Sequence, residues 1–290
     1  MQNFGGLTTT VLGAESMVPV VEGLPIETIS ILGGQGKNGA PEPLKRLDLK
    51  MGDIVSVVGP TGCGKTTLIN DIELYANCNT PTLRKVLING EPHPEEYLLD
   101  PCKNPMALIS QHTNFLSDLP VAVFLETHAR IRGLEEPSAA IEKTASFANQ
   151  LTGEPIILEN AMTELSGGQT RALLIADAVI IGNSPIILLD EIENAGIHRT
   201  RALELLKGYD KIFIFVTHDP RIALLSDYRV VMKDGAMQKL VVTGEEEKGV
   251  ATEIRKLDDL MLDLRQRIRM GEELSREQLC ARLRQLGYIA

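Results

Sequence analysis

The sequence predicts an α/β fold in which helices cover a mainly parallel sheet. A β-branched run, DIVSVV at residues 53–58, ends in the glycine-rich stretch GPTGCGK and is followed by TTLINDIELYA at helical spacing. This order of strand, glycine loop and helix opens an α/β unit. Further along, SPIILLD (184–190) and KIFIFVTHD (211–219) carry the bunched apolar residues of strands buried on both faces. These three runs form the core of the predicted sheet.

Weaker signals fill the N-terminal half of the chain. Residues 18–58 mix short apolar runs with the loop GGQGKNGAPEP (33–43), which we expect to be a solvent-exposed excursion between strands. KVLING (85–90) predicts a short strand. Residues 118–163 predict helices, because VAVFLETHARIRG and SAAIEKTASFANQL carry apolar residues at helical spacing.

The C-terminal part of the sequence predicts first a β-hairpin and then helices. VVMKDGAMQKLVV (230–242) predicts a hairpin with Asp234 and Gly235 in its turn. After GEEEKG, apolar residues at helical spacing predict a pair of helices or a short coiled-coil seam. They are Ile254, Leu257, Met261, Leu264 and Ile268, then Leu279, Leu283 and Leu286. This segment either packs on its own domain or contacts a second copy or a partner, and the sequence leaves both open.

Composition narrows the classes of protein. The chain has 290 residues, 43% of them hydrophobic, and a formal net charge of −10, which argues against nucleic acid as a partner. No apolar run reaches the roughly 18–20 residues that cross a bilayer, and the N-terminus lacks the pattern of a signal peptide. We therefore expect a cytoplasmic protein, with the inner face of the membrane as a second location. Four scattered cysteines favour reduced thiols over disulfides or zinc.

The stretch GPTGCGKT fits the phosphate-binding pattern G-x-x-x-x-G-K-[ST], placed between a strand and a helix as its mechanism requires. Glycines turn backbone N–H groups toward phosphate oxygens, and the helix N-terminus adds a positive dipole end. Lys65 is expected to reach the β- and γ-phosphates, and Thr66 to offer its hydroxyl to Mg²⁺. Cys63 is expected to act as a small spacer, with redox control as the alternative. The predicted nucleotide contacts are Gly59, Pro60, Thr61, Gly62, Cys63, Gly64, Lys65, Thr66 and Thr67.

The run IILLDE supplies two acids at the end of a buried strand. Asp190 is expected to hold Mg²⁺ through water, and Glu191 to polarise the attacking water as a general base. Two such acids could be solvated loop charges, but the phosphate cradle upstream favours the catalytic interpretation.

The stretch ELSGGQT (164–170) puts two glycines ahead of the apolar run ALLIADAVII. Each glycine costs a helix up to about 1 kcal/mol against alanine. The pattern therefore indicates a helix over 170–181 whose start must approach another group closely.

With GPTGCGKT, LSGGQ and LLDE in this order and spacing, residues 20–245 resemble the ATP-binding cassette (ABC) ATPase family. The resemblance implies a P-loop NTPase core of the RecA-like type, an antiparallel β subdomain and a helical signature subdomain. It also implies ATP and Mg²⁺ as cofactors, and a head-to-tail dimer in which the signature segment of one cassette faces the γ-phosphate held by the other. The expected contacts across that interface are Ser166, Gly167, Gly168 and Gln169.

Two further positions follow from the resemblance. Gln111, in LISQHTNF, is similar to the glutamine that senses Mg²⁺ and water and couples to the partner. His218, 27 residues after Glu191, is similar to the switch histidine that contacts the γ-phosphate. The predicted catalytic set is therefore Glu191, His218, Gln111 and Lys65, and the predicted metal set is Thr66, Gln111 and Asp190.

The chain departs from the family pattern at three places. The region before the phosphate loop, ETISILGG, has no aromatic residue to stack on adenine, so Ile29 or Ile31 is expected to pack there. The loop after LLDE reads NAGI (194–197), with Ile197 at the position of an expected aspartate. Asp177 stands where an arginine is common. Nucleotide preference and signalling across the dimer are accordingly left open.

We expect two domains, an ATPase domain over 1–249, with its helical subdomain at about 113–168, and a helical extension over 250–290. The expected function is ATP binding and Mg²⁺-dependent hydrolysis that do conformational work on a partner. That partner is the membrane subunit of a transporter or, alternatively, a soluble protein or metalloenzyme that the ATPase remodels. A DNA-repair role is disfavoured, because the chain has no long coiled-coil insertion and no basic stripe.

Overall fold

The computed structural model describes residues 25–110, 113, 117–191 and 199–289. Its centre is a six-stranded sheet in which every neighbouring pair is parallel except the last. In spatial order the strands are β5 (Met106–Ile109), β6 (Ile186–Asp190), β7 (Ile212–Val216), β3 (Ile54–Val58), β8 (Tyr228–Lys233) and β9 (Ala236–Val242). The predicted strands at 53–58, 184–190 and 211–219 are confirmed, as is the hairpin around Asp234 and Gly235.

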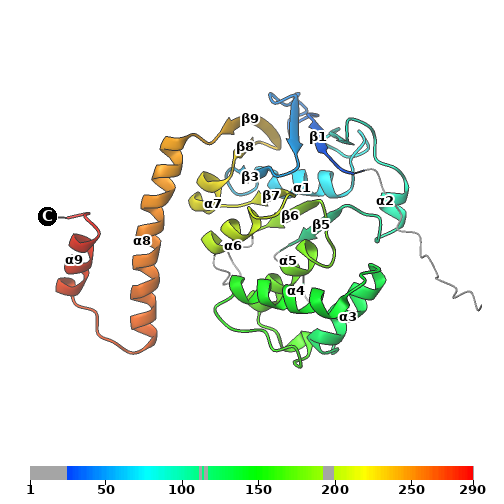
Figure 1. Cartoon of the computed structure of the whole chain (residues 1–290). Helices are drawn as coiled ribbons and strands as arrows, with labels where there is room; N and C mark the ends of the chain where they lie inside the picture. Colours follow the sequence, from blue (N-terminus) through cyan, green and yellow to red (C-terminus); the bar gives the residue numbers. More distant parts are fainter. Residues whose placement is uncertain (1–24, 111–112, 114–116, 192–198, 290) are drawn as a thin grey trace, which may run out of the picture.

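A second, three-stranded antiparallel sheet lies on one side of this centre (Figure 1). Its strands are β2 (Arg46–Lys50), β1 (Thr28–Leu32) and β4 (Lys85–Ile88), in that order. The two sheets enclose helix α1 (Lys65–Glu73), and apolar side chains of all three pack into one core cluster. This core fixes α1 against the sheet, and it therefore also fixes the phosphate loop, which directly precedes α1.

Helices cover the other face of the central sheet and make the second core cluster. Helices α3 (Val121–Ile131), α4 (Pro137–Leu151) and α5 (Gly167–Val179) form the helical lobe, and the helices predicted within 118–163 are confirmed. Helix α5 begins at Gly167, three residues before the predicted start, because Ser166 caps it. Two further helices of this layer are short, α6 (Arg199–Leu206) and α7 (Pro220–Leu225). The short helix α2 (Glu96–Leu99) lies instead on the side of the antiparallel sheet, where Tyr97 packs against the first core cluster.

The C-terminal segment forms two helices at the edge of the molecule (Figure 1). Helix α8 (Glu245–Arg269) lies between the sheet domain and α9 (Arg276–Gln285). The predicted helices are confirmed, and α8 begins before the proposed boundary at 249/250. Within the described ranges, no helix has both the length and the apolar character needed to cross a bilayer.

The loop at 33–43 differs from its prediction. Its tip, residues 37–41, is exposed, but Glu42 is fully buried and Gly34 is packed against the backbone after Thr82. A Cβ atom on Gly34 would lie 2.0 Å from the carbonyl oxygen of Thr82. The prediction of a wholly solvent-exposed excursion is therefore wrong, because its flanks take part in the core contacts of the antiparallel sheet.

Candidate functional site

The phosphate loop connects β3 to α1, and its glycines are required by its shape. Gly62 and Gly64 have φ of 75° and 98°, in the left-handed region that favours glycine. A Cβ atom on Gly59 would lie 2.4 Å from the carbonyl oxygen of Met232, so the loop also touches β8. A Cβ atom on Gly62, by contrast, would meet nothing within 4 Å, which leaves open space beside the loop. The loop is thus a preformed cradle that packs against β8 at Gly59 and faces open space at Gly62.

Lys65 lies inside this cradle rather than at the surface. Its side chain is buried, and its ammonium donates hydrogen bonds to the carbonyl oxygens of Gly59 (3.0 Å) and Pro60 (3.3 Å). Thr66 and Thr67 are exposed in the first turn of α1, where helix geometry leaves the N–H groups without intrahelical acceptors. Cys63 is buried and packs inward, as expected of a spacer. This arrangement fits an anion of several phosphates.

The two acids of IILLDE lie at the carboxyl end of β6. Asp190 is buried in the last position of the strand, beside Val216 of β7. Glu191 follows with φ of 49°, unusual for a residue other than glycine, and its N–H donates to the carbonyl oxygen of Val216 at 3.0 Å. This bend turns the Glu191 side chain out of the strand direction.

His218 meets Glu191 at the same edge of the sheet. The Nε2 atom of His218 lies 3.1 Å from Oε1 of Glu191, and the two side chains are 45% and 25% exposed. The contact exists because β6 and β7 are parallel neighbours, so the residues that follow both strands emerge together. The predicted general base and the predicted γ-phosphate contact therefore form a partly exposed pair.

The strand order brings the predicted catalytic segments to one edge. The phosphate loop follows β3, His218 follows β7 and Glu191 follows β6, and these strands are adjacent and parallel. Gln111 follows β5, the next strand in the sheet, but it lies outside the described residues, as does the NAGI loop. The Thr66 hydroxyl and the Asp190 carboxylate, both predicted to hold Mg²⁺, are oxygen ligands that suit this ion, and the Glu191 carboxylate lies at the same edge.

The signature segment lies at the start of α5. Ser166 caps the helix by accepting a hydrogen bond from the N–H of Gln169, whose own side chain accepts one from the N–H of Ser166 at 2.9 Å. The amide of Gln169 also donates to the carbonyl oxygen of Pro155 at 3.0 Å. Ser166 and Gly167 are exposed, and a Cβ atom on Gly167 would meet nothing within 4 Å. The segment is thus an ordered, solvent-facing helix start.

Two residues considered for base stacking are placed elsewhere. Ile29 and Ile31 are 0% exposed and belong to the core beneath the antiparallel sheet, so neither can contact a nucleobase. The prediction is wrong because alternation along β1 directs both side chains inward.

Asp177 has a partner that the sequence did not indicate. Its carboxylate lies 2.8 Å from Nδ1 of His128 on α3, and Arg132 donates to the other ring nitrogen at 3.3 Å. The acid therefore joins α5 to α3 within the helical lobe. No sequence motif contains both residues, which are 49 positions apart.

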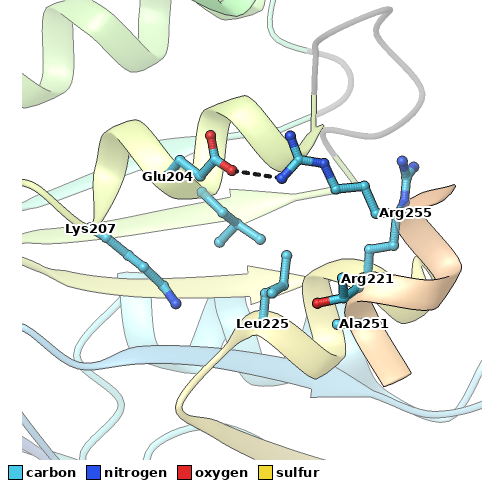
Figure 2. Close-up of a pocket in the computed structure, with 8 residues that line it drawn as sticks. Glu204, Lys207, Arg221, Leu225, Ala251 and Arg255 are labelled. Atoms are coloured by element: carbon cyan, nitrogen blue, oxygen red, sulfur yellow. Dashed lines mark hydrogen bonds and ion pairs between the residues drawn. The ribbon is translucent and has the colours of Figure 1, made fainter. Parts of the chain in front are cut away.

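A cavity of about 110 Å³ lies away from the phosphate loop, among α6, α7 and α8 (Figure 2). Leu203, Leu225 and Ala251 line it, and Arg255 closes one side by pairing with Glu204 at 3.2 Å. The cavity marks the joint between the C-terminal helix and the sheet domain, and we assign it no ligand.

Comparisons with known proteins agree with this geometry. The family model described as ABC transporter matches residues 45–194. An uncharacterized ABC transporter ATP-binding protein of Methanocaldococcus jannaschii is 48% identical over 256 residues, which are 88% of this chain and 98% of that protein. A spermidine/putrescine import ATP-binding protein of Legionella pneumophila is 32% identical over 202 residues, 67% of this chain and 53% of its own length.

Solved structures share the fold. A dimeric ATP-binding cassette in a post-hydrolysis state, bound to ADP and phosphate, has a TM-score of 0.56 at 24% identity and covers 74% of this chain and 99% of its own. The cbiO1 subunit of a transporter complex from Clostridium perfringens has a TM-score of 0.56 at 21% identity, with coverage of 82% and 99%. At these identities the likeness concerns the fold alone.

Proposed function

This chain belongs to the ABC transporter family of ATP-binding proteins and is an ATPase, and we propose that it works as one cassette of a head-to-tail pair. In the proposed pair, the phosphate loop of one cassette and the signature segment of the other hold one ATP between them. ATP binding closes the pair, and hydrolysis reopens it. The membrane subunit of a transporter takes up the resulting movement.

The observation that carries the pairing is the environment of Gly167. It is in helical conformation at the first position of α5, has no left-handed φ, and has open space where a Cβ atom would lie. Glycine is unfavourable in a helix, so neither the backbone conformation nor the packing of this chain accounts for it. A phosphate group approaching from a second molecule would account for it, because a bare helix N-terminus binds anions.

In the proposed hydrolysis, each described residue has a defined role. Lys65 holds the β- and γ-phosphate oxygens inside the cradle, and Thr66 and Asp190 would hold Mg²⁺, which neutralises charge on the phosphates. Glu191 accepts the proton of the attacking water while the bond from the γ-phosphorus to its bridging oxygen breaks. His218 keeps the Glu191 carboxylate oriented and contacts the γ-phosphate.

The pairing is tested with Glu191→Gln, which keeps the binding residues and removes the base. We expect phosphate release to fall by about 10²–10⁴-fold while ATP binding persists. On light scattering with Mg-ATP, this variant should form a dimer, and a second substitution, Ser166→Arg, should abolish the dimer. A strictly monomeric Glu191→Gln protein at saturating ATP, with no other cassette able to join it, would contradict the proposal.

The transporter role rests on the names of relatives, which are ATP-binding proteins of transporters. It is tested by purifying the tagged chain from its own cells after mild solubilisation of membranes. A membrane protein with several spans as the main partner supports the role. A soluble enzyme as the main partner would favour the remodelling alternative.

A further inference from the structure

We propose that Lys37, at the tip of the loop over residues 33–43, is a positioning residue that holds the phosphate loop in its binding shape. Its ammonium donates a hydrogen bond to the carbonyl oxygen of Gly62 at 2.7 Å. Gly62 lies in the middle of the phosphate loop, 25 positions later in the chain. The inference rests on the proposed nucleotide site and adds a residue that no phosphate-binding motif contains.

The loop that carries Lys37 is held firmly from below. Arg84 is fully buried and donates to both carboxylate oxygens of Glu42, at 3.1 and 2.6 Å, and to Asp71 of α1 at 2.8 Å. Glu42 in turn accepts from the N–H of Gly34 at 2.9 Å. Both flanks of the loop are therefore tied to the helix that begins at the phosphate loop.

The β8–β9 turn fills the space between the two loops. The N–H of Lys37 donates to the carbonyl oxygen of Asp234 at 2.8 Å, and the N–H of Gly235 donates to that of Cys63 at 2.9 Å. The contacts are tight enough to exclude side chains. A Cβ atom on Gly64 would lie 3.0 Å from Cα of Gly235, and one on Gly235 would lie 2.8 Å from Cγ of Lys37. The loop over 33–43, the β8–β9 turn and the phosphate loop are therefore closely packed where Lys37 contacts Gly62.

The peptide that Lys37 contacts is one that could otherwise rotate. The Gly62–Cys63 peptide turns about ψ of Gly62 and φ of Cys63, and Gly62, with φ of 75°, is a glycine whose torsion angles no side chain restricts. Lys37 holds the carbonyl end of this peptide, and the Cys63 N–H donates to the carbonyl oxygen of Pro60 at 3.2 Å. With both ends held, the neighbouring N–H groups keep one orientation, which a phosphate cradle needs.

A positioning role predicts a change in the nucleotide-free protein as well as in binding. The Cys63 thiol is 5% exposed, whereas Cys78 and Cys102 are exposed and serve as internal references. Loosening the loop should expose Cys63 to alkylation. The reagent is N-ethylmaleimide, and mass spectrometry resolves the rate at each cysteine.

The test compares wild type with Lys37→Met, which keeps the alkyl chain and removes the donor, and with Lys37→Arg, which keeps the charge. Lys45→Met is the matched control, because Lys45 is an exposed lysine between that loop and β2. In Lys37→Met we expect alkylation of Cys63 to accelerate and affinity for both ADP and inorganic tripolyphosphate to weaken, each by about tenfold, as for loss of a hydrogen bond from a charged donor. Lys37→Arg should recover most of both effects.

The inference is overturned if Lys37→Met leaves the Cys63 rate and both affinities within about twofold of wild type, or if Lys45→Met changes them equally. Failure of the proposed function is a separate result. A wild-type chain that binds neither ATP nor tripolyphosphate would refute the nucleotide site, while the Cys63 rates would still report on the contact between Lys37 and the loop.

Discussion

Two glycine-rich turns of this molecule each begin a helix, but they use glycine for different reasons. The phosphate loop needs Gly62 and Gly64 for left-handed backbone, and Gly64 also lies against Gly235. The signature segment keeps helical backbone at Gly167, with open space around it. The contacts of this chain explain the glycines of the first turn, whereas we propose that a phosphate held by a second molecule explains Gly167. On that proposal the phosphate loop is complete within one chain, and the signature segment completes the nucleotide site of the partner.

The largest expected difference concerns the charges that hold the helix after each turn, α1 in one case and α5 in the other. Beneath the phosphate loop, burial alone would lower the pKa of Arg84, but the paired carboxylates of Glu42 and Asp71 raise it above its ordinary value. We expect Arg84→Met to lower the free energy of unfolding by about 3–5 kcal/mol, because it leaves two buried carboxylates without their cation.

The matched variant in the helical lobe is His128→Asn. The side chains of His128 and Asp177 are 25% and 12% exposed, so their pair should contribute about 1 kcal/mol or less. Urea unfolding measures both losses. Equal losses would show that the two helices are held alike by their charges and would break this part of the comparison.

A second pair of variants should act in opposite directions. Gly64→Ala places a Cβ atom on left-handed backbone and against Gly235, so we expect a loss of about 1–3 kcal/mol in unfolding free energy. Gly167→Ala should instead raise stability, by up to about 1 kcal/mol, because alanine is the better helix former.

Activity completes this second test. Gly167→Ala should lower the rate of phosphate release although the fold is more stable, since the added methyl group faces the incoming phosphate. Thermal unfolding and phosphate release are measured on the same samples. A Gly167→Ala protein with full activity would remove the argument that its glycine serves another molecule.

The pH dependence of stability tests the central sheet, which both turns share, independently of the turns. Lys211 precedes β7, at the end opposite to His218, and burial lowers its pKa to about 8. Between pH 8 and the ordinary value of 10.5, the unfolded chain holds a proton there that the folded chain does not. Stability should therefore rise over this window, by about 1–2 kcal/mol once the full shift is discounted for solvent screening. The measurement is urea unfolding at several pH values.

Lys211→Met should flatten that rise, although it also leaves the side-chain oxygen of Asn183 without its donor at 2.7 Å and lowers stability at every pH. Lys207→Met, at an exposed lysine, is the control and should keep the wild-type slope. If the free energy of unfolding of Lys211→Met rises with pH as steeply as that of wild type, another group titrates in this range.

The last expected effect is also small and concerns the cap of the signature helix. Ser166→Ala removes the oxygen that accepts from the Gln169 N–H and should cost about 1 kcal/mol in stability. Ser166→Asp should restore the cap but place a negative charge where the phosphate is expected. Circular dichroism melting and ATP-dependent dimer formation are compared. Recovery of stability without recovery of the dimer supports the comparison, whereas recovery of both contradicts it.

The sequence by itself determined the local features of the fold, which depend on short stretches of consecutive residues. The phosphate loop between β3 and α1, the buried strand that ends at Asp190 and the hairpin turn at Gly235 all follow from local patterns of glycine and apolar residues. A single stretch of chain contains all that these features need, so they are found where the patterns placed them.

Tertiary structure decided which of these stretches meet. Glu191 contacts His218 because β6 and β7 are neighbours, and Lys37 contacts Gly62 because the loop over 33–43 packs beside the phosphate loop, with the turn at Gly235 against both. The same limit explains the error at Ile29 and Ile31, since spacing from the phosphate loop says nothing of the face on which β1 buries them. Contacts between distant residues depend on strand order and burial, and the whole chain settles both at once.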